Sequence, residues 1–255
     1  MRYHPILNST LSVCVNISFI ILFIFFDSII NSCAKIPINT KETPIRCNQA
    51  EAQQKMGWWR AAFKINWPDK REPLWYVDLI LAHKIIAPIL DAYQDQIGLW
   101  RFHRRAARDS AGHQFSFIFY CSTDLATTIM SKIKVNHLAQ HLIQTGKITK
   151  VYLQSTAKIK ESNLEATSDT HWSKPMQRAW PYYIQGISRM WLTLIDQYTL
   201  NVLKNNDRAA KDLDVLYQKV NQKMIQTWQE EGAHALLHHL NALFGYRPLK
   251  LKMRF

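Results

Sequence analysis

The chain has 255 residues, 47% hydrophobic and 20% charged, so it is long and apolar enough to bury one or two cores, and disorder is excluded for most of it. Its 32 Lys and Arg residues against 19 Asp and Glu residues give a net charge of +13, which favours anionic partners such as nucleic acid, anionic lipid head groups or an acidic protein. The 7 glycines never form a G-x-G pattern, which excludes the dinucleotide fingerprints, phosphate loops, nucleophile elbows and kinase lids that need closely spaced glycines.

Residues 1–33 are typical of a signal or anchor segment. A short, positively charged start precedes a continuous apolar run over 19–26, and small polar residues then lead to Cys33. The end of the segment resembles the lipobox of bacterial lipoproteins, in which a branched apolar residue stands three positions before the cysteine and a small residue directly before it. Ile30 and Ser32 match this pattern. The resemblance implies that Cys33 is diacylated and becomes the first residue of the mature protein.

Two alternatives for the N-terminus stay open. The stretch from Leu11 to Ile30 is 20 residues long, enough for a single transmembrane helix, and cleavage without lipidation would release a secreted protein. The lipoprotein and the transmembrane anchor both place the chain at the membrane of the bacterial cell envelope. Residues 34–57 contain two prolines and little hydrophobic periodicity, so we expect a tether there.

Residues 58–156 predict an α+β domain that begins with a strand and a helix. Apolar and polar side chains alternate over 61–67, as in a strand with one buried face. Apolar residues then recur every three to five positions from 77 to about 96, which predicts an amphipathic helix that is perturbed near Pro88.

The rest of this domain predicts a hairpin, a second helix and a last strand. Two alternating runs, 99–108 and 113–121, flank a turn, and a helix capped by Asp124 precedes a strand over 150–156. The order β-α-β-β-α-β is that of a ferredoxin-like antiparallel sheet. Because its helices lie on one face, the other face must meet solvent, a ligand or another domain.

The C-terminal part predicts a helical region. Residues 157–172 are polar and predict a linker, and 173–255 carry a long helix after Pro181 and a second, broken apolar stripe with a kink or boundary at Gly232. The tail 249–255 alternates apolar and basic residues, which favours an edge strand over a segment lying on an anionic surface.

The strongest candidate site is a basic strand. Arg101, His103 and Arg105 would share a face, because strand side chains alternate, and their charges repel one another unless an anion or a carboxylate neutralises them. Arg60 and Lys64 of the first strand would extend this face. The pattern therefore predicts a surface for a phosphate- or carboxylate-bearing partner. The alternative is an edge strand whose charges block aggregation.

The same strand carries a family resemblance. Trp100-x-Phe102-x-Arg104, followed by Asp109 and His113, resembles the C-terminal domain of lantibiotic dehydratases and thiopeptide-type bacteriocin biosynthesis proteins over the whole of the predicted α+β domain. The resemblance implies a peptide-modifying enzyme component as an alternative function. Family members carry alternating arginines in the next strand, where this chain has neutral residues.

An enzyme of that kind needs a pocket between the sheet and the C-terminal helices, with converging polar groups. The sequence offers Arg104, His113 and His234 for this role. No catalytic set stands out by its spacing, so we expect a non-catalytic protein.

A second resemblance is to the RNA recognition motif. Phe115, Phe117, Ile118 and Tyr120 match aromatic and apolar positions of its third strand. The resemblance implies that Phe115 and Phe117 stack on bases. Alternating aromatic residues also form sheet cores, and export of the chain argues against nucleic acid as a partner.

The last pattern suits a metal by its spacing. Glu231, His234 and His238 would lie on one face of a helix, yet zinc needs three or four such ligands and a di-iron site needs a second Glu-x-x-His. We expect solvated histidines, no metal and no cofactor. Cys47 and Cys121 are the pair left for a disulfide, and Cys121 fits a small buried core residue better. The expected partners are the membrane and an anionic lipid or acidic envelope protein.

Overall fold

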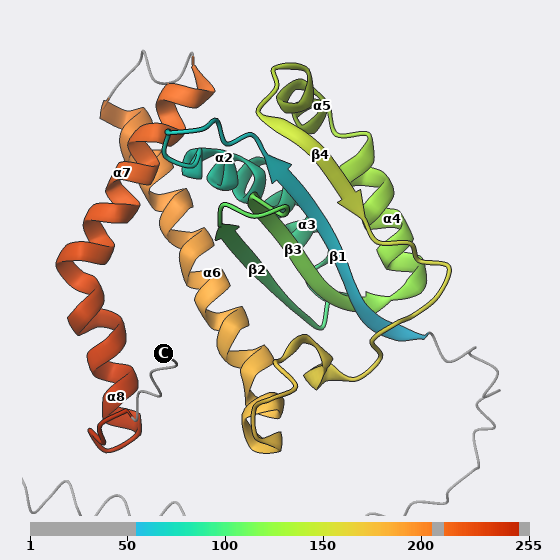
Figure 1. Cartoon of the computed structure of the whole chain (residues 1–255), viewed down its shortest axis with the longest axis vertical. Helices are drawn as coiled ribbons and strands as arrows, with labels where there is room; N and C mark the ends of the chain where they lie inside the picture. Colours follow the sequence, from blue (N-terminus) through green and yellow to red (C-terminus); the bar gives the residue numbers. More distant parts are fainter. Residues whose placement is uncertain (1–54, 206–211, 250–255) are drawn as a thin grey trace, which may run out of the picture. The chain divides into compact units, whose positions relative to one another are not determined.

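The computed structural model describes residues 55–205 and 212–249, and the predicted signal segment, nearly all of the tether and the last six residues lie outside the described residues. Its centre is a four-stranded antiparallel sheet in the order β2-β3-β1-β4 (Figure 1). The strands are β1 (Met56–Ile65), β2 (Leu99–Ala106), β3 (His113–Ser122) and β4 (Ile148–Leu153). The predicted α+β class and the helical C-terminal region are confirmed.

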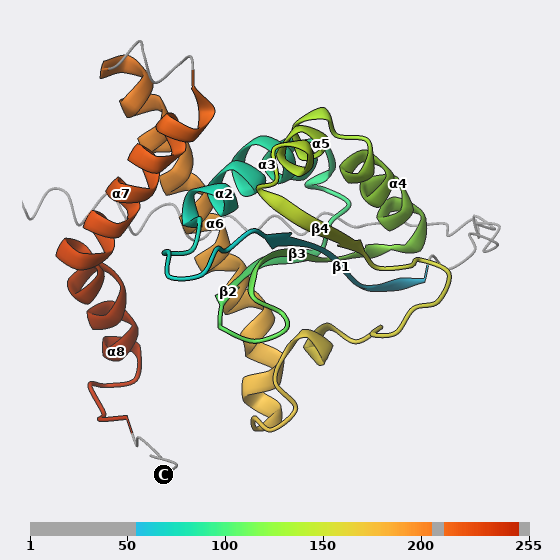
Figure 2. The ribbon, with the colours of Figure 1, turned by 45° about the horizontal axis from the view of Figure 1, so that its top comes forward.

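Helices cover one face of this sheet (Figure 2). They are α2 (Trp75–Ile80), η1 (Leu81–Ile86), α3 (Ala87–Tyr93), α4 (Thr123–Lys134) and α5 (His137–Gln144). Between helices and sheet, Trp59, Phe63 and Phe117 are fully buried, and burial of a large apolar side chain contributes about 1.5–3 kcal/mol. Cys121 is buried in the same core, as expected, and Cys47, the other cysteine of the possible disulfide, lies outside the described residues.

The first helix follows the predicted position but is interrupted by a wider turn. Between α2 and α3, the segment η1 is a π-helix, and the Ala87 N–H donates to the carbonyl of Ala82 five residues earlier. Pro88 follows directly, and it can neither donate a backbone hydrogen bond nor pack its ring against the preceding turn. The perturbation near Pro88 that the sequence predicts is therefore a π-turn.

The second predicted helix is two helices, and its cap is a different residue. Ser122, rather than Asp124, caps α4, and its hydroxyl accepts a hydrogen bond from the Leu125 N–H at 3.4 Å. Asn136 caps α5 and accepts from the Ala139 N–H at 3.0 Å. The sequence pattern ran through this break because the apolar stripe continues on both sides of it.

The long helix α6 (Lys174–Asn205) begins seven residues before Pro181, whereas the sequence predicted a helix after this proline. Pro181 has no N–H for the carbonyl of Gln177, one turn earlier, and the Ser168 hydroxyl donates to that carbonyl instead, at 2.7 Å. α6 also packs along the β2 edge of the sheet, where the Phe102 N–H donates to Ser188 Oγ at 3.0 Å.

The remaining helices form an arm that packs on α6 and α2. They are α7 (Leu213–Gly232), η4 (Ala233–His238) and α8 (His239–Leu243). The boundary predicted at Gly232 is confirmed, and a Cβ there would lie 2.9 Å from a ring atom of Trp228. No helix in the described part of the chain is long and apolar enough to cross a membrane.

The segment predicted as a linker, 157–172, lies against the sheet. It contains η2 (Leu164–Thr167) and covers one end of the face that the helices leave open (Figure 2). The Trp58 N–H donates to the carbonyl of Glu161 at 2.8 Å, and the Tyr120 hydroxyl donates to the carbonyl of Ser162 at 2.9 Å. These bonds use backbone acceptors, which no side-chain pattern reveals.

Candidate anion-binding site

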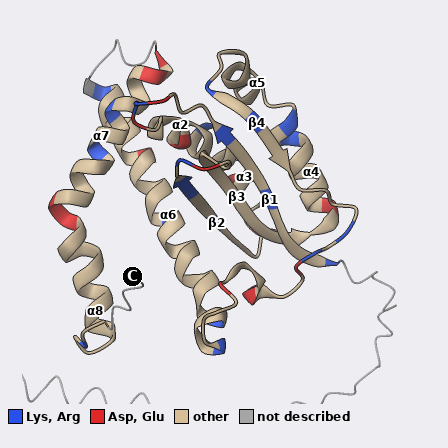
Figure 3. Cartoon of the chain, in the orientation of Figure 1, with Lys and Arg blue, Asp and Glu red and all other residues tan. Residues whose placement is uncertain are grey.

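The strand register brings all five residues of the predicted basic surface, four cations and His103, to the open face of the sheet. Arg60 of β1 and Arg101 of β2 stand opposite Ile118 of β3 from its two sides, and Lys64 and Arg105 stand opposite Gln114 in the same way. Figure 3 shows Lys and Arg positions on both β1 and β2. We call this surface the basic face and define it by six residues, the sixth of which was not predicted: Arg60, Lys64, Arg101, His103, Arg105 and Lys150.

The cations of the basic face differ in what neutralises them. Arg105 forms an ion pair with Asp109 at 2.5 Å. Arg60 donates instead to the Ser116 hydroxyl at 3.2 Å, and Lys64 donates to a backbone carbonyl in the turn between β2 and β3 at 2.9 Å. Their partners are neutral, so the charges of Arg60 and Lys64 are hydrogen-bonded but not compensated.

Arg101 is the most constrained of these cations. Its Nε donates to Thr167 Oγ1 at 2.8 Å, and its Nη2 lies 3.4 Å from the Thr167 carbonyl oxygen. Burial lowers the pKa of Arg101, the charge of Arg60 lowers it further, and Glu161 opposes both effects. In the described part of the chain no carboxylate lies within 4.0 Å of Arg60, Lys64 or Arg101.

The same excess of positive charge acts on the His103 side chain. Its pKa is lowered from 6.5, first by partial desolvation and then by the charges of Arg101, Arg60 and Arg105. A bound anion would favour the protonated form of His103 and oppose the effect of these charges.

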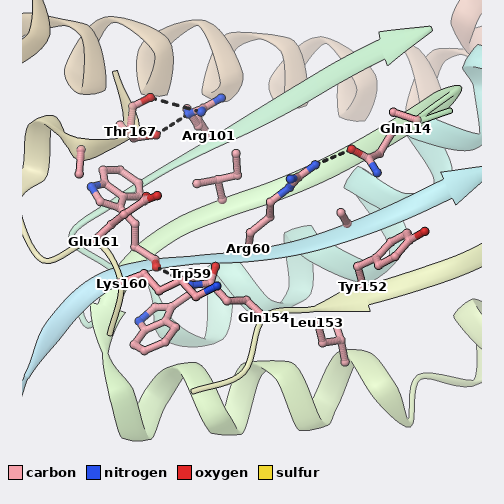
Figure 4. Close-up of a pocket in the computed structure, with 15 residues that line it drawn as sticks. Trp59, Arg60, Arg101, Gln114, Tyr152, Leu153, Gln154, Lys160, Glu161 and Thr167 are labelled. Atoms are coloured by element: carbon pink, nitrogen blue, oxygen red, sulfur yellow. Dashed lines mark hydrogen bonds between the residues drawn. The ribbon is translucent and has the colours of Figure 1, made fainter. Parts of the chain in front are cut away.

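A pocket of about 710 Å³ lies above one end of the basic face, between the strands and the 157–172 segment. Arg60 comes from β1 and Arg101 from β2, while Lys160, Glu161 and Thr167 come from the segment (Figure 4). The sequence did not point to these last three residues, because polar residues in an irregular segment carry no periodicity that would place them over a sheet.

Two phenylalanines that the RNA recognition motif would place on the nucleic-acid face lie in the core. Phe115 and Phe117 have no exposed surface and point toward the helices, so they cannot stack on bases. The expectation from that resemblance is therefore wrong. The alternation of β3 is that of a sheet core, in which odd-numbered residues face the helices and even-numbered residues face the pocket.

Three of the remaining candidates do not join the basic face. Glu231 lies near the end of α7, and His234 and His238 lie on η4, all exposed. The rings of His234 and His238 stack at 5.2 Å, but the described residues contain no group of three or more side chains placed to hold a metal ion.

A buried ionic cluster was only partly foreseen. Arg104 donates from Nε to Asp78 Oδ2 at 2.7 Å, and His113 Nε2 lies 3.0 Å from Asp78 Oδ1. The guanidinium carbon of Arg104 lies 5.0 Å from the ring centre of Trp75 and 4.8 Å from that of Trp191. The sequence pointed to Arg104 and His113 but not to Asp78. Asp78 is buried, yet its place in an amphipathic helix is one that an exposed carboxylate could equally occupy.

Two of the three members of the cluster are closed to a ligand. The side chains of Asp78 and His113 have no exposed surface, and 28% of the Arg104 side chain is exposed. Arg104 therefore is the one member of the cluster that a ligand could touch.

Comparisons of this chain with models of known protein families, with curated proteins and with solved structures found no match.

Proposed function

We propose that this chain is a non-catalytic protein of the bacterial cell envelope, anchored at the membrane by its N-terminal segment, whose basic face binds an anionic partner. The observation that carries the proposal is a set of three cations on one sheet face, Arg60, Lys64 and Arg101, none of which has a carboxylate within 4.0 Å among the described residues. Hydrogen bonds between a charged donor and an anion are about twice as strong as neutral ones. An anion therefore forms stronger hydrogen bonds with these three cations than the water molecules it displaces.

The architecture that presents this face is proposed to be ferredoxin-like. Support comes from the β-α-β-β-α-β order of β1 to β4 with their helices, and from the position of β3 between β1 and β2. In such a split arrangement the helices gather on one face, which leaves the other face for a ligand.

The anchor is proposed from residues 1–33, which lie outside the described residues. Support comes from the lipobox-like end of this segment at Cys33. Intact-mass analysis of the membrane fraction distinguishes a diacylated chain that begins at Cys33 from an uncleaved transmembrane chain.

The binding proposal is tested with a labelled hexaglutamate peptide and the full chain in an uncharged detergent, with fluorescence anisotropy as the readout. We expect Arg101→Gln to weaken binding about tenfold, the effect of losing one charge-assisted contact. Arg105→Gln is the matched variant on the same strand and face, and its effect should be smaller because Asp109 already neutralises Arg105.

Lys84→Gln provides the second control, since Lys84 is exposed on η1 at the helix-covered side of the sheet. Its affinity for the peptide should equal that of the unmodified chain. Equal losses in all three variants would show that binding follows net charge alone, and the proposal would then be wrong.

A further inference from the structure

A second cavity, of about 1060 Å³, lies between α6, the α7–α8 arm and β2. Its walls on the helices are almost entirely apolar, and include Ile184, Trp191, Trp228 and Leu240. Its third wall is β2, with Arg101, His103 and Arg104. No Asp or Glu is present among the described residues that line this groove.

The rim of the groove exposes large apolar side chains. The exposed fractions are 57% for Trp228, 54% for Leu237 and 83% for Leu243. Large apolar patches of this kind mark binding surfaces, because covering them removes apolar surface from water. The groove is therefore built for an apolar occupant.

The groove and the basic face meet at one residue. Arg101 lines both the pocket above the basic face and the wall of the groove, and His103 follows it along β2. Arg104 is already paired with Asp78. In the described part of the chain no carboxylate lies within 4.0 Å of Arg101 or His103, and Glu161 acts on Arg101 only from farther away. The positive charge of Arg101, with the His103 ring beside it as a hydrogen-bonding group, thus lies at the one wall of the groove that is not apolar.

We propose that the groove holds the acyl chain of an anionic membrane lipid, whose head group is bound by Arg101 and His103. This inference rests on the proposed function and names the chemical class of its anionic partner. An acidic protein segment without apolar side chains would satisfy Arg101 but leave Trp228 and Leu237 in water. A lipid has its charge at one end and its apolar part at the other. Its head group would meet the β2 wall, and its acyl chain would lie against the apolar helical walls.

The test uses the full chain reconstituted into phosphatidylcholine vesicles. These contain a phosphatidylglycerol probe with a photoactivatable diazirine near the end of one acyl chain, and the cross-linked peptides are mapped by mass spectrometry. We expect cross-links in the α6 and α7–α8 peptides that line the groove. A probe with the same acyl chain and a choline head group should give about tenfold fewer cross-links, because it lacks the net negative charge that Arg101 attracts.

Two variants separate the groove from general contact with a membrane. Leu237→Glu places a charge in the groove and should reduce the cross-links there about tenfold, the effect expected when an unpaired charge meets an apolar chain. Ile225→Glu is the matched control, because Ile225 is 45% exposed on α7 and does not line the groove. Both residues are exposed, so neither substitution removes a core contact.

Cross-links confined to residues 1–33 would overturn the inference, as would equal labelling by the two head groups or equal losses in Leu237→Glu and Ile225→Glu. If the lipid probe fails while Arg101→Gln still weakens hexaglutamate binding, the basic face binds an anion other than this lipid, and only the lipid assignment falls. If Arg101→Gln affects neither probe, the proposed function falls as well.

Discussion

At the scale of single residues, the buried Asp78 contacts two side chains, one partly exposed and one fully buried. It bonds the partly exposed Arg104 and lies against the fully buried His113. Asp78 Oδ1 and both ring nitrogens of His113 have no well-aligned hydrogen-bond partner in the described structure, so the cluster is sensitive to any loss of charge.

We predict that Asp78→Asn lowers the free energy of unfolding by about 3 kcal/mol, because removing one partner of a buried pair leaves an uncompensated charge. Urea denaturation followed by tryptophan fluorescence measures this change. Asp69→Asn is the control, since Asp69 pairs with Arg108 at 3.5 Å and its side chain is 99% exposed. Surface pairs of this kind contribute little, and an equal effect of the two variants would contradict a stabilising role of the buried cluster.

His103 predicts how binding depends on pH. Its pKa is lowered in the free protein by desolvation and by the charges of Arg101, Arg60 and Arg105, and a bound anion raises it. The complex therefore holds more protons than the free protein between the pKa of His103 in the free protein, which lies below 6.5, and its higher pKa in the complex, and affinity rises as the pH falls through this range.

The measurement is the affinity for hexaglutamate between about pH 7.5 and pH 5.5, a range in which glutamate stays ionised. His103→Gln should flatten the dependence, whereas His137→Gln, on α5 at the other side of the sheet, should leave it intact. If affinity still depends on pH in His103→Gln, the pH dependence arises from another group.

At the scale of elements, α6 shows how a proline fits inside a long helix. The carbonyl of Gln177 would be buried without a partner if Ser168 did not donate to it, because Pro181 has no N–H. The segment that carries Ser168 is thereby attached to the first turns of α6, and it also forms the outer wall of the pocket above the basic face.

We predict that Ser168→Ala costs about 1–3 kcal/mol of stability, the penalty of a buried unsatisfied carbonyl. In a Pro181→Ala background the cost should be smaller, since the alanine N–H can donate to Gln177. Urea denaturation of the four proteins gives this coupling. Ser162→Ala is the control, because Ser162 contributes its backbone carbonyl rather than its hydroxyl. Additive effects of the two substitutions would contradict the assignment.

At the scale of the whole molecule, the strands and the basic face could be predicted from the sequence because their signals are local. Period-two alternation puts Arg101, His103 and Arg105 on one face wherever the strand lies. The same rule, applied without the register, could not tell which face of β3 meets the helices, and the resemblance to the RNA recognition motif consequently assigned Phe115 and Phe117 to the wrong side.

The features that the sequence did not reveal depend on contacts between distant segments. The pocket needs Thr167 to meet Arg101 across 66 positions of the chain, and the groove needs α6 and the α7–α8 arm to diverge beside β2. Helical periodicity identifies the apolar stripes of both helices, but an uncovered stripe and a packed stripe have the same sequence pattern. The tail over 249–255, predicted as an edge strand, lies almost wholly outside the described residues.

The closure of one sheet edge limits how copies of this chain can assemble through their strands. A filament built by strand addition needs two accepting edges on every copy, one for the preceding molecule and one for the next. Here α6 occupies the β2 edge through Ser188, and β4 is the other end of the described sheet. Among the described strands, pairing through the β4 edge can therefore join two copies into a closed dimer, whereas an open chain of molecules would require α6 to leave the β2 edge.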